Sequence, residues 1–167
     1  MMTVRPIRLF GDPVLRSRTD RVVHFDASLR ALVADLLDTV QVPGRAGVAA
    51  NQIGVGLAVF SYNIDGDLGY VINPQLVEVR GDAVSVDEGC LSVPGLAYPR
   101  RRHPWARVEG VDLDGNAVAV QGEGLLAQAL QHETDHLEGP GYVEGLEPEL
   151  KREAMRAIRT ADWFQRP

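Results

Sequence analysis

Residues 131–136 read Gln-His-Glu-Thr-Asp-His, and this short stretch decides how the rest of the chain must be arranged. It contains the pattern His-Glu-x-x-His, with His132 and His136 four residues apart. Residues at that spacing lie one turn above each other on an α-helix, so both imidazoles can reach one metal ion. Two histidines and a glutamate would be costly to bury on a helix without partners. The pattern therefore predicts a metal site on an inward-facing helix.

Glu133 is rotated by about 100° around the helix axis from the histidine stripe. Its own stripe consists of leucines: Leu126, Leu130 and Leu137. Desolvation among leucines raises the pKa of a carboxyl group, whereas a nearby metal cation lowers it. In either case Glu133 is placed to accept a proton from a water molecule beside the metal. Leu125 and Ala129 continue the histidine stripe, so we expect both to face inward.

A catalytic site of this kind needs a third protein ligand and an open position for water. No histidine follows His136, and the downstream glutamates lie mostly in loop or surface-helix contexts. Upstream, Cys90 is the only cysteine and lies in the segment Glu-Gly-Cys-Leu-Ser-Val-Pro-Gly of residues 88–95. A lone cysteine is usually a small buried hydrophobe. Glycines and a proline around it instead indicate a backbone shaped to present a thiol, which makes Cys90 the candidate third ligand.

The composition is that of an ordinary globular domain. The chain has 167 residues, of which 45% are hydrophobic and 24% charged, so we expect a single catalytic domain spanning 1–167. The formal net charge of −6 gives no indication of nucleic-acid binding. Residues 1–9 contain no continuous apolar segment, so we expect no signal peptide, no membrane anchor and a cytoplasmic location.

Apolar periodicity divides the chain into a helix, a series of strands and two further helices. Helices are predicted after the capping residue Asp26 up to Pro43-Gly44, and over 125–137 and 148–164. Short segments rich in β-formers lie between them, at 57–62, 69–72, 76–79, 84–87, 108–113 and 117–121. The last two flank Asp-Gly-Asn, a strong hairpin signal. This order predicts an α+β fold with antiparallel sheets packed around a central metal-binding helix, plus an N-terminal and a C-terminal helix.

Three segments resemble, in order and spacing, the three signature motifs of the peptide deformylases. They are Gly-Val-Ala-Ala-Asn-Gln-Ile-Gly at 47–54, Glu-Gly-Cys-Leu-Ser at 88–92 and His-Glu-Thr-Asp-His-Leu at 132–137. Residues 7–16 are also similar to the N-terminal segment of that family, so the likeness spans nearly the whole chain. The cysteine segment together with the histidine helix is far more specific than either alone.

The resemblance implies an enzyme that removes the formyl group from the N-formylmethionine of nascent polypeptides and releases formate. Cys90, His132 and His136 would bind one divalent metal ion, Fe²⁺ in the native protein, which Zn²⁺, Ni²⁺ or Co²⁺ can replace. Imidazole and thiolate ligands accommodate all of these ions. Metal-bound water would attack the formyl carbon, with Glu133 as the general acid and base.

The resemblance also assigns the groups around the substrate. The Gln52 side chain and the Leu91 backbone N–H would stabilise the oxyanion, and Gly47 and Val48 would line the substrate edge. The partners would be N-formylmethionyl peptides and nascent chains, with ribosome association by the last helix, as proposed for relatives. No membrane and no direct nucleic-acid binding are expected.

Glu88 and Asp135 are candidates to orient the imidazoles or to hold an arginine of the run 100–102. For Asp135, a plain charge on the helix surface is an equal alternative. The sequence also departs from the pattern of the family. Arg45 stands where glycine is usual, Val48 where leucine is usual, and Gly-Pro-Gly-Tyr at 139–142 replaces a more hydrophobic segment. These departures put the substrate range in question and leave the metal ligands intact.

Two other functions compete with this reading. A general His-Glu-x-x-His peptidase would cleave unformylated peptides and would tolerate the loss of Cys90. A specialised or weakly active deformylase paralogue, with altered substrate or inhibitor preference, is suggested by Arg45 and Val48.

Overall fold

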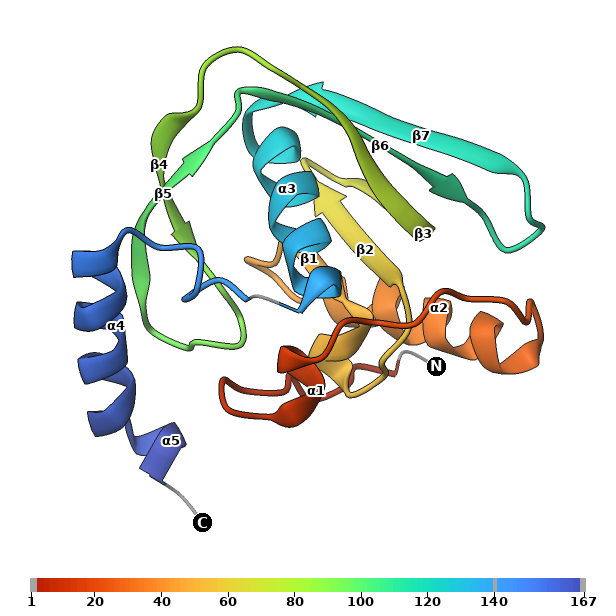
Figure 1. Cartoon of the computed structure of the whole chain (residues 1–167). Helices are drawn as coiled ribbons and strands as arrows, with labels where there is room; N and C mark the ends of the chain where they lie inside the picture. Colours follow the sequence, from red (N-terminus) through yellow and green to blue (C-terminus); the bar gives the residue numbers. More distant parts are fainter. Residues whose placement is uncertain (1–2, 140, 166–167) are drawn as a thin grey trace.

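The computed structural model describes residues 3–139 and 141–165, so Pro140 of the segment 139–142 lies outside the described residues. Its centre is a five-stranded antiparallel sheet with the strand order β1-β2-β3-β6-β7 (Figure 1). The strands are β1 (Gly47–Ala49), β2 (Val59–Ile64), β3 (Asp67–Arg80), β6 (Trp105–Val111) and β7 (Ala117–Glu123). Within the described chain β1 pairs with β2 alone, so its other edge is free.

Helices cover both faces of this sheet. Helix α2 (Ala27–Val40) begins where the Asp26 carboxylate accepts a hydrogen bond from the Leu29 amide at 3.1 Å. Since side chains alternate along a strand, neighbouring strand residues join different cores. One core joins α2 to the sheet through residues that include Leu36, Val48, Val59 and Ile72. The other joins helix α3 (Gly124–Glu138) to it through residues that include Ala49, Phe60, Val71 and Leu130.

A second, two-stranded antiparallel sheet lies beside α3 and is made of β4 (Val84–Gly89) and β5 (Ala97–Arg102). Helices α4 (Pro148–Thr160) and α5 (Asp162–Gln165) follow at the C-terminal end. Ala154 and Ile158 of α4 are fully buried in a third core together with Tyr98, Tyr142 and Cys90. Two short helices, α1 (Pro13–Arg16) and the 3-10 helix η1 (Ala50–Ile53), complete the fold.

The predicted α+β architecture is confirmed, including the central helix and the hairpin of β6 and β7. The two strands predicted at 69–72 and 76–79 are instead one strand, β3, with a register shift between Ile72 and Gln75. Asn73 adopts a left-handed conformation there, with φ 52°. Its side chain accepts from the Val22 amide at 2.8 Å and donates to the Val22 carbonyl at 3.0 Å. What looked like a turn is therefore a bulge that holds the N-terminal segment.

Three further elements differ from the sequence prediction. Strands β1 and β5 were not predicted, because the first is only three residues long and the second contains Pro99 and three arginines. The last helix is not continuous to Phe164, since Ala161 is extended (φ −71°, ψ 135°) and separates α4 from α5. Nowhere in the described chain is a helix both long and apolar enough to cross a membrane.

Candidate active site

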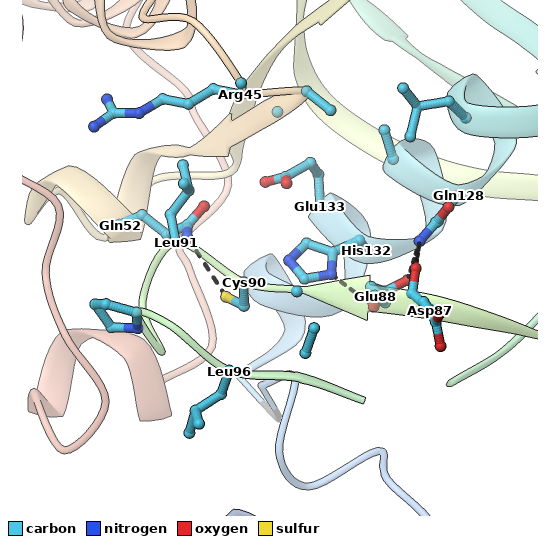
Figure 2. A pocket seen from close by; sticks show the side chains of 18 of the residues that line it. Arg45, Gln52, Asp87, Glu88, Cys90, Leu91, Leu96, Gln128, His132 and Glu133 are labelled. Atoms are coloured by element: carbon cyan, nitrogen blue, oxygen red, sulfur yellow. Dashed lines mark hydrogen bonds and ion pairs between the residues drawn. The ribbon is translucent and has the colours of Figure 1, made fainter. Parts of the chain in front are cut away.

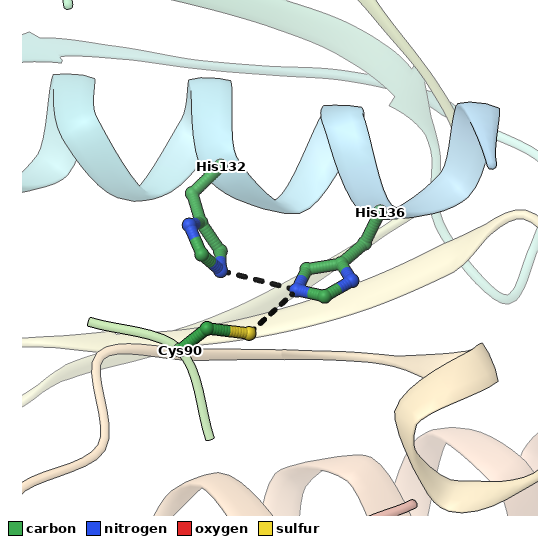
Figure 3. Close-up of side chains that lie close together, drawn as sticks. All are labelled: Cys90, His132 and His136. Carbon is green, nitrogen blue, oxygen red and sulfur yellow. Dashed lines mark hydrogen bonds between the residues drawn. The ribbon is translucent and has the colours of Figure 1, made fainter. Parts of the chain in front are cut away.

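Helix α3 places its two histidines side by side, as the spacing predicted. Their Nε2 atoms are 3.1 Å apart, and the Sγ atom of Cys90 lies 3.2 Å from Nε2 of His136 (Figure 3). Cys90 follows the last residue of β4, and a turn closed by the Val93 amide and the Cys90 carbonyl at 2.9 Å presents its thiol. All three side chains are buried, and their ligand atoms lie within 4.8 Å of one another.

This donor set fits a divalent metal ion. Ligands bound at 2.0–2.3 Å in a tetrahedral site are roughly 3 to 4 Å from each other. The Nε2–Nε2 distance of 3.1 Å and the Sγ–Nε2 distance of 3.2 Å to His136 lie in that range. A shared metal ion explains why two imidazole nitrogens and a thiol face one another in the protein interior. Imidazole and thiolate suit several transition metals, so the residues present define a site for a divalent ion without selecting one.

The electrostatics around Cys90 favour its ionised form. Burial raises the pKa of the thiol, but the charge of His136 and the hydrogen bonds from both histidines lower the pKa to about 5. A thiolate is the form that binds metal. For His132 the two effects have the opposite signs: burial lowers its pKa, but its hydrogen bonds to Cys90 and Glu88 raise that pKa well above the ordinary value.

Glu88 fixes the orientation of His132. Its Oε2 atom lies 2.8 Å from Nδ1 of His132, while Arg102 donates from Nε and Nη2 to its two oxygens at 2.8 and 2.7 Å. Burial raises the pKa of Glu88, but Arg102 and His132 outweigh it and hold that pKa at about 2. The carboxylate is therefore charged and accepts a hydrogen bond from Nδ1–H, which directs the other ring nitrogen of His132, Nε2, toward His136 and Cys90.

Asp135 is not a plain surface charge. Its Oδ2 atom accepts from Nη1 of Arg102 at 2.7 Å and from Nη2 of Arg100 at 3.1 Å. Arg102 itself is only 6% exposed. Asp135 of α3 and the two arginines of β5 thus tie the helix that carries the histidines to the two-stranded sheet that Cys90 directly follows.

The sequence analysis did not find the role of Tyr142. Its hydroxyl donates to the backbone carbonyl of Glu88 and accepts from the amide of Tyr98 at 2.8 Å. Burial raises the pKa of Tyr142 to about 12, so the phenol stays protonated and able to donate. This residue braces the end of β4 next to Cys90. Only its place in an unusual segment, 139–142, singled it out in the sequence.

Glu133 lies next to the ligand set with its carboxylate directed toward the cleft (Figure 2). The side chain is 3% exposed, and within the described residues its Oε2 atom has no hydrogen-bond partner. Burial raises the pKa of this carboxyl group. Gly47 of β1 packs against it so closely that a Cβ atom at residue 47 would lie 2.8 Å from Oε1. A free carboxylate with a raised pKa is suited to proton transfer.

Gln52 and the Leu91 amide lie on the other side of the ligand set. The Gln52 side chain accepts from the Ala49 amide at 3.0 Å and donates to Oγ of Ser92 at 3.1 Å. Its amide nitrogen is also 3.9 Å from the sulfur of Cys90. None of the described hydrogen bonds uses the Leu91 N–H. The Leu91 N–H therefore has no partner among the described residues, whereas the Gln52 amide directs its two hydrogens toward Ser92 and the Cys90 sulfur.

These groups open into a cleft of about 550 Å³. One wall consists of residues 44–47, and the other includes residues 87–91 and 94–97, while Leu125, Ala129 and His132 of α3 form the base. The prediction that Leu125 faces inward is wrong, since its side chain lies at the cleft and is 50% exposed.

Val48 does not line the cleft, contrary to the sequence prediction. Its side chain is 0% exposed and packs in the core beneath α2. Its backbone lies opposite Ser61 of β2, whose hydroxyl donates to the Val48 carbonyl at 3.3 Å. Alternation along β1 thus turns Gly47 toward the cleft and Val48 away from it.

One cleft brings together a thiol and two imidazoles, a carboxylate without a partner, and the amide groups of Gln52 and Leu91. These groups define a metal-dependent hydrolase. The profile of the family described as polypeptide deformylase matches residues 4–152. The chain belongs to the polypeptide deformylase family.

Relatives and solved structures cover nearly the whole chain. The peptide deformylase of Acidothermus cellulolyticus is 49% identical over 162 residues, which are 97% of this chain and 89% of that protein. Peptide deformylase 1 of Corynebacterium efficiens is 43% identical and covers 99% of this chain and 100% of its own length. The crystal structure of a peptide deformylase from Legionella pneumophila superposes with a TM-score of 0.88 at 35% identity, covering 99% of this chain and 100% of that one.

Proposed function

We propose that this chain removes the formyl group from the N-formylmethionine of nascent polypeptides and releases formate. The single observation that carries this proposal is the position of Cys90, whose sulfur lies 3.2 Å from His136 and completes the donor set of the His-Glu-x-x-His helix. A thiol ligand from an upstream strand distinguishes this site from that of a general peptidase with the same helix motif. Family membership supports the same reaction.

Cys90, His132 and His136 hold the metal in this proposal. A divalent ion bound there lowers the pKa of a water molecule and polarises the formyl oxygen. Glu133 accepts a proton from the attacking water and returns it to the methionine nitrogen as the C–N bond breaks and formate leaves. The unpartnered oxygen and the raised pKa of this carboxyl group support both halves of that role.

Gln52 and Leu91 stabilise the negative charge that develops on the formyl oxygen, through the side-chain amide and the backbone N–H. Ser92 and the Ala49 amide hold the Gln52 side chain in place, so little reorganisation is needed during the reaction. Gly47 leaves the space in which a substrate backbone approaches Glu133. The Val48 side chain packs β1 against α2 and faces away from the cleft.

The native ion is proposed to be Fe²⁺, with Zn²⁺, Ni²⁺ and Co²⁺ as working replacements. We further propose that residues 1–167 act as one cytoplasmic catalytic domain, that nascent chains are its partners, and that its C-terminal helix associates with the ribosome. A peptide deformylase from Synechococcus elongatus, which superposes with a TM-score of 0.85 at 31% identity, is described in complex with actinonin. We propose that the cleft of this chain binds the same compound.

Formate release from a formyl-Met peptide, measured after anaerobic purification with metal analysis, tests the function. We expect formate from the formylated peptide, no cleavage of its unformylated counterpart, and loss of turnover on chelation. Cleavage of the unformylated peptide by a Cys90→Ala variant would instead identify a general peptidase. Tight actinonin binding with negligible turnover would indicate a weakly active paralogue. That alternative was suggested by Arg45 and Val48, and the burial of the Val48 side chain leaves only Arg45 in its favour.

A further inference from the structure

The rim of the cleft carries charge at two places. Two of the charged residues that line the cleft are accounted for, because Glu88 is paired with Arg102 and Glu133 is buried beside the metal ligands. The others are Arg45, next to β1, and Asp87, on β4. Figure 2 shows them on opposite sides of the cleft, with the Arg45 side chain extending away from Glu133. The rim therefore has a positive and a negative side.

Arg45 has hydrogen-bonding capacity to spare. Its Nη1 atom donates to the Thr39 carbonyl at 2.9 Å, near the C-terminal end of α2. A guanidinium group has five N–H donors, and within the described residues no carboxylate oxygen lies within 4.0 Å of this one. The side chain is half-buried, so its charge is partly removed from water. Only the carbonyl end of the α2 dipole offsets that charge.

The free edge of β1 leads from the metal ligands toward Arg45. Gly44, Ala46 and Gly47 line the cleft along with Arg45, and β1 uses only its far edge to pair with β2. An extended peptide can add to such an edge through its backbone. A peptide that paired with this edge with its formyl group at the metal ligands would run along this wall, and the side chains after methionine would lie near Arg45.

We propose that Arg45 makes this cleft select formylated peptides with an acidic side chain at the first or second residue after formylmethionine. The inference rests on the proposed function and names a substrate class within it. The chain carries a net charge of −6, so an acidic peptide is repelled by the molecule as a whole. A positive side chain next to the bound peptide would counteract this repulsion at the cleft and favour an acidic peptide there.

Matched peptide pairs test this inference. Formate release is measured for formyl-Met-Glu-Ala against formyl-Met-Gln-Ala, and for formyl-Met-Ala-Glu against formyl-Met-Ala-Gln. At one position or both, we expect the Glu peptide to have a kcat/KM about two- to five-fold higher at low salt, as for a partly exposed charge pair. Screening should bring this ratio close to one at about 0.5 M salt.

Three variants connect the ratio to one side chain. Arg45→Gln is expected to bring the Glu/Gln ratio to one or below, whereas Arg45→Lys should retain part of the preference. Arg107→Gln is the matched control, because it removes the same charge from a partly exposed site on β6, which is not among the residues that line the cleft, and should leave the ratio unchanged. A general loss of stability lowers kcat/KM for both peptides of a pair alike, so it cannot imitate a change in the ratio.

The outcomes separate the two proposals. A ratio near one at both positions in the unmodified protein, or an unaltered ratio in Arg45→Gln, would overturn the role of Arg45 and leave the proposed function in place. In that case the bond to Thr39 would make Arg45 a helix-capping residue only. Absence of formate from all four peptides, with metal bound, would overturn the proposed function and this inference with it.

Discussion

The carboxylate of Glu133 lies directly over Gly47, so that a Cβ atom at residue 47 would stand 2.8 Å from Oε1 and 2.9 Å from Cγ. Both atoms belong to the side chain whose carboxyl group we propose to move the proton. Gly47→Ala should therefore displace Glu133 and lower kcat/KM for a formyl-Met peptide by roughly 10- to 100-fold, as small misplacements of reacting groups do. Gly56→Ala is the control, since nothing lies within 4 Å of its added Cβ. Equal kinetics for the two variants would contradict the positioning role.

Replacement of Glu133 by glutamine keeps the shape of the side chain and removes its basicity. Turnover should fall by about 10²- to 10⁴-fold, the usual contribution of a positioned acid or base. Metal content should stay at one ion per chain, because Glu133 is not among the three donors. The exposed Glu138 on the same helix provides a matched control, Glu138→Gln. A metal-loaded Glu133→Gln protein with full turnover would show that another group moves the proton.

Glu88→Gln removes the carboxylate that holds Nδ1 of His132 at 2.8 Å. We expect the dissociation constant of the metal to rise by about 10- to 100-fold, the typical effect of losing such a partner. Competition with a chromophoric chelator measures it, at a temperature where circular dichroism shows the variant folded. Glu109→Gln changes an exposed glutamate of β6 and should keep the original affinity. Unchanged metal affinity in Glu88→Gln would count against the orienting role.

Asn73 predicts a stability effect that is independent of catalysis. Asn73→Ala loses both bonds to Val22 and places a Cβ-bearing apolar residue at φ 52°. The free energy of unfolding should fall by about 2 kcal/mol, measured by urea denaturation of the metal-loaded protein. Asn73→Gly also loses the bonds but tolerates the backbone conformation. Its free energy of unfolding should therefore lie between those of the unmodified protein and of Asn73→Ala. A glycine variant less stable than the alanine variant would refute this account of the bulge.

The sequence predicted best where periodicity and side-chain chemistry coincide. Helix α3 was correctly predicted because four-residue spacing, the leucine stripe and Gly139 all point to a helix that ends there. The proximity of Cys90 to that helix could not be predicted from local sequence patterns. The two histidines are local to each other, whereas the thiol comes from a separate strand, and the residues alone made it only a candidate. The resemblance to a family supplied that step.

What the sequence missed depends on long-range contacts. Glu88 and Asp135 were candidates to hold an arginine of the run 100–102, but the sequence could not tell which one; the structure shows that both pair with Arg102, which is buried. Asn73 and the residue after it look like a turn, and only the pairing of β3 with β6 shows a bulge. The resemblance placed both Gly47 and Val48 at the substrate edge, whereas the short strand β1, which was not predicted, turns the Val48 side chain into the core.

The free edge of β1 also bears on how these molecules behave at high concentration. An unpaired strand edge is a template on which a second copy of the same chain can add, which leads to self-association. Here the strand spans only Gly47–Ala49, and the wall that continues it carries the bulky charged side chain of Arg45. A single substrate strand finds enough backbone to pair with, whereas a longer sheet has no continuous ladder to build on. We therefore expect little self-association through this edge, which we propose to bind the substrate peptide.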